Sequence, residues 1–244
     1  MKPEEKAQIS NALNMRFARW RNINRHVDRI ILSILLFMIA FVGSALVDNW
    51  MFLERGIESV KYHSFDELLA INSDTVAWLR IDGTHIDYPV VHGEDNFVYL
   101  DKGFDGKYYA GGSIFLDKSN DPSFADKYNI VHGHNMAAGV MFGDLERFLE
   151  KGFFARHGTG TLLTPEYDYD LQITAAGIYD AYDMDIYTPG GIIPTQKISE
   201  KAVLAKKDAA GDPKQILALS TCTNDLNDDR VMVFFRMLNR RKHE

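Results

Sequence analysis

The sequence has one cysteine, Cys222, at the end of an apolar run, 216–221, and before an acidic polar loop, 223–229. A thiol at the end of a strand is held by rigid backbone and stays reachable for a substrate. The reactive form is the thiolate, and a free thiol with a pKa of about 8.5 is mostly protonated at neutral pH. Cys222 therefore needs an imidazole or a cation beside it. We expect it to be a nucleophile, the alternative being a small buried core residue.

A cation is available directly after that loop, where Arg230 begins a second strand-like run, 230–238. Two such runs joined by a short loop form a hairpin most simply, which would place Cys222 and Arg230 at the same end of a sheet. The guanidinium group would then stabilise the thiolate and an oxyanion formed from the substrate. It also offsets Asp225, Asp228 and Asp229, which act to raise the pKa of the thiol.

The imidazole candidates are His132 and His134, which follow the apolar run 129–131 and flank a glycine. A strand that runs into a glycine-containing turn presents a side chain well for proton transfer. By spacing alone the two histidines could also bind a metal ion, but no third acidic or histidine ligand adjoins them in the sequence. We therefore expect neither a metal ion nor a cofactor.

The chain as a whole has an ordinary globular composition. It contains 244 residues, 46% of them hydrophobic, with a net charge of −7. An acidic balance argues against a general nucleic-acid-binding protein. One cysteine excludes an internal disulfide framework and any zinc or iron–sulfur site built from several cysteines.

One segment differs from the rest. Residues 30–47 carry no charge over 18 positions, and as a helix they would span about 27 Å, close to the thickness of a bilayer core. Seven basic and three acidic residues precede them. We expect a cytoplasmic segment, 1–29, a transmembrane anchor, 30–47, and an extracellular remainder. The alternatives are a cleaved signal peptide and a buried core helix.

After the anchor, residues 48–75 show helical spacing, and residues 76–244 are expected to form the catalytic domain. Helices are expected at 140–149, ending near Gly152, and at 199–207 within a long connection between residues 182 and 215. Eight short strand-like runs indicate a mainly β fold, a barrel or sandwich with appended helices. They are 76–81, 86–91, 113–116, 129–131, 161–164, 171–179, 216–221 and 231–238.

Several segments together resemble the class B sortases, the membrane-anchored cysteine transpeptidases of Gram-positive bacteria. The resemblance covers roughly residues 65–240 in the family's order. The segments that carry it are 129–136 (NIVHGHNM), 141–145 (MFGDL), 219–223 (LSTCT) with Arg230, 78–83 (WLRIDG), 86–91 (IDYPVV), 95–100 and 111–117 (GGSIFLD). The sequence departs from the family in having Ala218 where threonine is usual, and His132 where tyrosine is common.

This resemblance implies an eight-stranded sortase β-barrel with N-terminal helices and a helix in the long connection. It implies that His134 is the catalytic histidine, Cys222 the nucleophile and Arg230 the residue that stabilises substrate and oxyanion. Positions that line the family's sorting-signal groove correspond to Asn96, Leu100, Ser220 and Thr221.

The function implied is cleavage of an NPxTx-like sorting motif after its threonine, followed by transfer of the thioacyl group to an amine. Expected partners are secreted proteins that carry this signal, peptidoglycan or its lipid-linked precursor as acceptor, and the membrane. Alternatives are a sortase that joins pilins, a surface cysteine peptidase that hydrolyses its substrate, and a surface binding module in which Cys222 is incidental. The chain ends at Glu244 without an apolar tail, which disfavours the usual pilus-polymerising class.

Overall fold

The computed structural model describes residues 31–44, 64–206, 214–222 and 228–243, with Cys222 described by its backbone. The chain divides into two compact units, Met1–Phe52 and Leu53–Glu244. In the first unit, residues 31–44 are helical and their large apolar side chains are exposed. No helix among the described residues has both the length and the apolar character to cross a membrane. Residues 1–30 and 45–63 lie outside the described part. They include all of the predicted cytoplasmic segment, both ends of the predicted anchor and most of the predicted helical region, 48–75.

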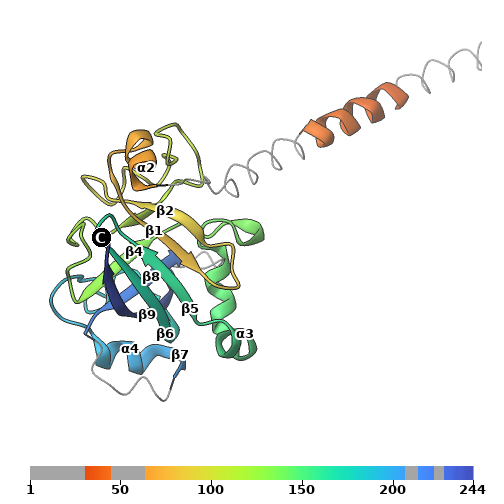
Figure 1. Cartoon of the computed structure of the whole chain (residues 1–244). Coiled ribbons are helices and arrows are strands. Elements are labelled where there is room, and N and C mark those ends of the chain that lie inside the picture. Colours follow the sequence, from red (N-terminus) through yellow and green to blue (C-terminus); the bar gives the residue numbers. More distant parts are fainter. Residues whose placement is uncertain (1–30, 45–63, 207–213, 223–227, 244) are drawn as a thin grey trace, which may run out of the picture. The chain divides into compact units, whose positions relative to one another are not determined.

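The second unit is mainly β (Figure 1). Nine strands among its described residues form one sheet in the order β5-β1-β2-β3-β4-β8-β9-β6-β7, and β5 also pairs with β6. This last pairing closes eight strands into a barrel and leaves β7 outside it, on β6. The strands are β1 (Thr75–Ile81), β2 (Asp87–Val91), β3 (Ile114–Leu116), β4 (Tyr128–His132), β5 (Thr159–Leu163), β6 (Tyr167–Asp180), β7 (Ala202–Ala205), β8 (Ile216–Cys222) and β9 (Asp229–Lys242).

Short helices lie outside the barrel (Figure 1). The helix α2 begins after Ser64, whose hydroxyl oxygen accepts a hydrogen bond from the amide of Glu67. This is an N-cap, and the acidic residues of the first turn suit the positive end of the helix dipole. The helices are α2 (Phe65–Ile71), the 3₁₀ turns η1 (Ala137–Gly139) and η2 (Gly143–Leu149), α3 (Lys151–Arg156) and α4 (Thr195–Lys201).

Alternating side chains of β8 and β9 enter two different cores. Leu219 and Val233 belong to the large apolar cluster, together with most of the buried residues of the barrel. Ala218 and Phe234 belong to a second cluster, which includes Ile186 and α4. Because successive side chains of a strand point to opposite faces, β8 is buried on both sides. The long connection between β6 and β8 thus covers the outer face of the strands that carry Cys222 and Arg230.

All eight predicted strands are present, and the barrel confirms the predicted mainly β fold. Two helix predictions were wrong in detail. The predicted helix 140–149 is a 3₁₀ turn, η2, which the extended backbone of Glu150 separates from α3, and Gly152 lies inside α3 instead of ending a helix. The helix of the connection is α4, which begins before the predicted range and overlaps it only at residues 199–201. The following residues form β7, because that segment pairs with the free edge of β6.

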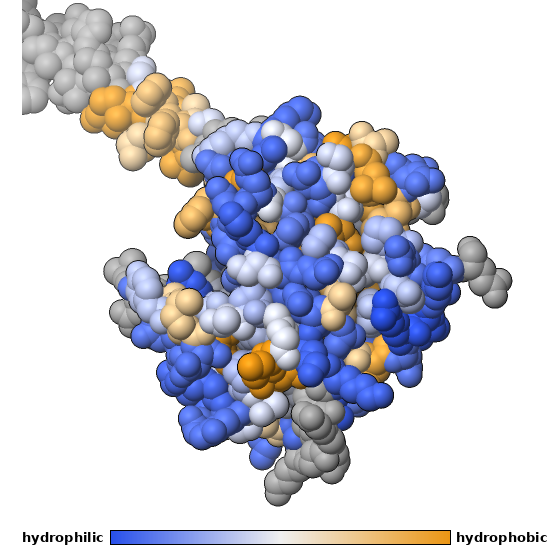
Figure 2. All heavy atoms as spheres, turned by 90° about the vertical axis from the view of Figure 1, so that its left-hand side faces the viewer, coloured by the Kyte–Doolittle hydropathy of each residue, from blue (hydrophilic) through white to orange (hydrophobic). Residues whose placement is uncertain are grey.

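The surface of the second unit is largely hydrophilic on the face drawn in Figure 2, where apolar residues gather in a few separate groups. Exposed large apolar side chains include Phe97 and Leu100, in the segment between β2 and β3. Others, Tyr182, Met184 and Ile192, lie in the connection between β6 and β8.

Candidate active site

The register of β8 and β9 brings two predicted site residues together. The strands are antiparallel, and Cys222 is the pairing partner of Arg230. Directly paired residues of an antiparallel ladder have Cα atoms about 4.5–5.5 Å apart. The predicted hairpin is therefore confirmed, and the two residues share one end of the sheet. Residues 223–227 of the loop between them lie outside the described residues.

The histidine turn leaves the sheet at the same end. Strands β4 and β8 are parallel, with His132 paired to Ser220. The amide of Gly133 donates to the carbonyl oxygen of Ser220, at 3.2 Å. His134 and Cys222 each follow this pair by two positions, so the backbone places both beyond the last rung of the β4–β8 ladder. The arrangement joins His134, Cys222 and Arg230, predicted on three separate segments, at one edge of the barrel.

The half-buried ring of His134 is held by a main-chain group. Its Nε2 atom lies 2.7 Å from the carbonyl oxygen of Leu100. A carbonyl oxygen only accepts, so Nε2 carries the hydrogen and Nδ1 is the nitrogen that can take up or release a proton. The turn itself is fixed by a hydrogen bond of 3.0 Å from the amide of Phe142 to the carbonyl oxygen of His134, and by a bridge between Asn135 and Met141.

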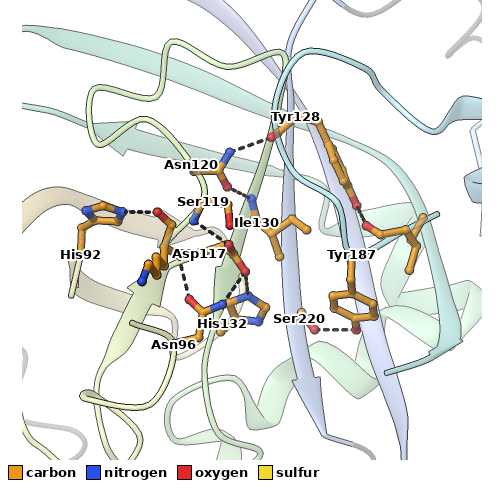
Figure 3. A network of polar contacts seen from close by, with 12 residues as sticks. His92, Asn96, Asp117, Ser119, Asn120, Tyr128, Ile130, His132, Tyr187 and Ser220 are labelled. Carbon is orange, nitrogen blue, oxygen red and sulfur yellow. Dashed lines mark hydrogen bonds and ion pairs between the residues drawn. The ribbon is translucent and has the colours of Figure 1, made fainter. Parts of the chain in front are cut away.

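His132 has a different environment from His134. Its Nε2 lies 3.1 Å from Oδ2 of Asp117, the residue that follows β3. The same carboxylate oxygen accepts a hydrogen bond from Nδ2 of Asn96 at 2.9 Å, and Oδ1 accepts from the amide of Ser119 at 2.9 Å. Figure 3 shows His132 between Asp117 on one side and the pair of Ser220 and Tyr187 on the other.

The Asp117 carboxylate is nearly buried, and two opposing effects act on its pKa. Burial raises the pKa. The hydrogen bonds from His132 and from the Ser119 amide lower it by more, so the pKa of Asp117 lies below its ordinary value. Asp117 is thus a carboxylate, and the three donors around it satisfy its charge. Sequence reasoning did not assign it to the site. The one signal in the sequence was an acidic residue directly after an apolar strand.

Ser220 and Thr221 lie on opposite faces of β8, and each is 2% exposed. The Ser220 hydroxyl group lies 2.9 Å from the hydroxyl group of Tyr187, in the connection. The ring of Tyr187 stacks on His132 with centroids 6.4 Å apart. Thr221 lies two positions after Leu219 and therefore on the same face of β8, the face toward the large apolar cluster. Its Oγ1 has no hydrogen-bond partner among the described residues.

Asn96 and Leu100 belong to the segment that faces the histidine turn. The Asn96 side chain accepts from the amide of Lys118 at 2.8 Å as well as donating to Asp117. Its second amide hydrogen has no hydrogen-bond partner within the described part of the chain and could donate to a ligand. Leu100 contributes its carbonyl group to His134, and its side chain is exposed. Across the described ranges, no three His, Cys, Asp or Glu side chains are grouped so that they could hold a metal ion.

Comparisons with known proteins agree with this architecture. The family model of the sortase domain matches residues 79–237. Sortase B of Listeria monocytogenes is 32% identical over 166 residues, which is 65% of this chain and 67% of that protein. Among solved structures, a Streptococcus pyogenes class B sortase involved in pilus biogenesis is 37% identical with a TM-score of 0.67, covering 74% of this chain and all of that one. Sortase B of Clostridium perfringens is 27% identical with a TM-score of 0.66, covering 72% and 100%. The chain therefore belongs to the sortase family and is a class B sortase, a cysteine transpeptidase.

Proposed function

We propose that Cys222 is the nucleophile, His134 the general acid and base, and Arg230 the residue that stabilises the oxyanion. The observation that carries this assignment is the backbone register. Cys222 of β8 is paired with Arg230 of β9. Strand β4 runs parallel to β8, and the turn that carries His134 follows β4 at the end of the sheet where Cys222 lies. Three residue types that a thiol transpeptidase needs meet at one edge, although His134 and Arg230 are 96 positions apart in the sequence.

In the first half of the reaction, the Cys222 thiolate attacks the carbonyl carbon of a threonine in the sorting motif. The tetrahedral oxyanion forms a hydrogen bond with the Arg230 guanidinium group. The C–N bond then breaks, and the leaving amine takes a proton from the imidazolium form of His134. The products are a thioester on Cys222 and a released C-terminal peptide.

In the second half, an acceptor amine attacks the thioester. Neutral His134 takes the amine proton, the new amide forms, and the Cys222 thiolate leaves. Sortases act on proteins that bear a sorting signal and on cell-wall peptidoglycan, and for this chain we propose a peptidoglycan cross-bridge amine or its lipid-linked precursor as acceptor. The proposed signal is an NPxTx-like pentapeptide.

The peptide would lie between the segment that carries Asn96 and Leu100 and the connection that covers β8. The remaining amide hydrogen of Asn96 and the exposed side chain of Leu100 are suited to contact it. Ser220 is buried, and its contribution would be to orient Tyr187 in the groove wall. Thr221 would act through its backbone, since its side chain is on the core side of β8.

The proposed location is the outer face of the cell membrane. The support is the uncharged run 30–47, with basic residues before it, and the exposed apolar side chains of the helix 31–44. Residues 1–29 would be cytoplasmic, 48–75 an extracellular segment and 76–244 the catalytic domain. Protease treatment of intact cells should then remove an epitope at the C-terminus and spare one at the N-terminus.

Product analysis tests the proposed reaction. The full-length protein in detergent is incubated with a sorting-motif peptide, with and without an amine acceptor. Transpeptidation predicts that the amide product appears only with the acceptor and that its yield follows acceptor concentration. Equal amounts of free acid in both reactions would instead identify a peptidase.

A second candidate function has specific support. One similar solved structure is the Streptococcus pyogenes class B sortase involved in pilus biogenesis, and another is sortase B from the type II pilus of Streptococcus pneumoniae, which is 32% identical with a TM-score of 0.62. The acceptor would then be a lysine amine of a pilin. Competition between a lysine-containing pilin peptide and a cross-bridge peptide for the same thioester separates the two functions.

A further inference from the structure

The proposed function explains His134, but it leaves the second imidazole and the buried carboxylate unexplained. His132 and Asp117 form a hydrogen-bonded pair directly beside the site, with Nε2 of His132 3.1 Å from Oδ2 of Asp117. Asp117 also accepts hydrogen bonds from Nδ2 of Asn96 and from the amide of Ser119. Burial of a carboxylate costs free energy of folding unless its hydrogen bonds are complete. A function of this pair at the site would account for that cost.

The contacts of Asp117 lead back to the catalytic histidine. Asp117 accepts from Asn96 at 2.9 Å, and Asn96 in turn accepts from the Lys118 amide. Asn96 therefore fastens the segment 95–100 to the end of β3 by two hydrogen bonds. The segment 95–100 begins with a turn in which Oδ1 of Asp95 accepts hydrogen bonds from the amides of residues 97 and 98, at 2.7 and 2.9 Å.

The same turn ends at the group that holds His134. The amide of Leu100 donates to the carbonyl oxygen of Phe97, at 3.1 Å, and the carbonyl oxygen of Leu100 accepts from Nε2 of His134. Any shift of the 95–100 turn therefore moves the acceptor that sets the orientation and tautomer of the His134 ring.

We propose that Asp117 and His132 are positioning residues for transpeptidation, which orient His134 through Asn96 and the carbonyl group of Leu100. This inference rests on the proposed role of His134. His132 acts as the donor that fixes the Asp117 carboxylate in place. His132 and His134 thus sit at the same strand end with distinct roles: one holds a carboxylate, and the other transfers protons.

The wall of the groove is tied to the same pair. The His132 ring lies against Tyr187, whose hydroxyl group meets Ser220 (Figure 3). Phe115 packs against the ring as well, with centroids 5.3 Å apart. The imidazole is therefore held by rings from β3 and from the connection, which keeps its Nε2 directed at Asp117.

Two pairs of variants test the proposal. Asp117→Asn removes the charge. Asp121→Asn is its matched control, because Asp121 lies in the same loop and its carboxylate accepts hydrogen bonds from the amide and the hydroxyl group of Ser123. His132→Phe keeps a ring and removes the donor to Asp117. His132→Gln keeps a neutral donor near the position of Nε2 and serves as the conservative rescue.

The measurements are the kinetics of amine release from a sorting-motif peptide and the ¹⁵N imidazole spectrum of His134 in the full-length protein. We expect Asp117→Asn and His132→Phe to lower kcat by about tenfold to a hundredfold with little change in KM, since a misplaced catalytic group affects the chemical step. His132→Gln should recover most of kcat. The Nε2 signal of His134 should shift in the two impaired variants and stay in place in Asp121→Asn.

Unchanged kcat and an unchanged His134 spectrum in Asp117→Asn would overturn the proposal, as would a raised KM with normal kcat. Should a variant not fold, as judged by thermal unfolding, the comparison of His132→Phe with His132→Gln still decides. Loss of activity in His134→Ala is tested separately. If the wild-type protein forms no thioester, the proposed function fails. The His134 spectrum still decides whether Asp117 and His132 orient the His134 ring.

Discussion

Cys222 and Arg230 are direct pairing partners across the antiparallel strands β8 and β9. Their separation is fixed by the ladder and not by the loop between them. A long arginine side chain that starts this close can reach groups bound at the cysteine. Arg230 is half-buried at this edge, and its Nη1 donates to the carbonyl oxygen of Asp229 at 3.2 Å. The planar fork of N–H donors in a guanidinium group is suited to an oxyanion.

Replacement of Arg230 by lysine should remove most of the activity. A lysine keeps the charge but replaces a planar fork with a point charge, so it cannot place two donors on the oxyanion. We expect kcat/KM for thioester formation to fall by about 100-fold, the cost of one lost oxyanion donor. Peptide cleavage kinetics measure this, and activity within a few-fold of wild type would show that charge alone suffices.

Gly133→Ala should impair both stability and turnover. A Cβ atom there would lie 2.5 Å from Cδ1 of Ile114 and 2.8 Å from the ring of Phe142, so these buried side chains or the turn that carries His134 must shift, and we expect the turn to move. Overpacking of this kind costs about 1–3 kcal/mol of the free energy of unfolding.

Gly152→Ala is the matched control. Gly152 lies in α3 with nothing within 4 Å of its Cβ position, and alanine should raise the free energy of unfolding by about 0.5–1 kcal/mol with no change in kcat. Denaturant unfolding and peptide cleavage measure both variants. A Gly133→Ala protein with normal kcat would mean that the turn tolerates displacement.

The hydrogen bond between Tyr187 and Ser220 should couple the connection to β8. In a double-mutant cycle of Tyr187→Phe and Ser220→Ala, we expect a coupling of about 1 kcal/mol in the free energy of unfolding. Because Tyr187 forms part of the proposed groove wall, Tyr187→Phe should raise KM more than it lowers kcat. A coupling near zero would show that each hydroxyl group finds water instead.

The stability of the protein should depend on Asp117 at acid pH. Its folded pKa lies below the ordinary value of 3.8, despite burial, because of hydrogen bonds from His132 and Ser119. A group with a lowered folded pKa adds stability that is fully present above the unfolded pKa and is lost as the pH falls through the folded pKa. The wild-type protein should therefore lose stability more steeply below about pH 4 than Asp117→Asn does. Parallel slopes of the free energy of unfolding against pH would contradict this.

Much of the site was predictable because its residues lie at strand ends. The runs before Cys222 and His132 are apolar, and the short loop before Arg230 favours a hairpin, so local pattern and turn length were enough to place these residues at strand ends. The choice of His134 over His132 came from the resemblance to class B sortases. The eight barrel strands follow from the same patterns.

Other features depend on contacts that the sequence does not display. β7 was predicted as helix because Ala, Val and Leu suit either structure, and only the free edge of β6 decides for a strand. Asp117 lies 15 residues before His132 in the sequence, and its meeting with the imidazole depends on the antiparallel pairing of β3 with β4. The contact between His134 and Leu100 uses the main-chain carbonyl group of Leu100, so no residue type in the sequence indicates it.

The most direct test of the account is the intact mass of the full-length protein after incubation with a sorting-motif peptide in the absence of acceptor. Wild-type protein should gain the mass of the N-terminal peptide fragment, and hydroxylamine should release it. Cys222→Ala should gain no mass. An adduct that persists in Cys222→Ala, or the absence of any adduct from wild-type protein that cleaves the peptide, would contradict thioester chemistry at Cys222.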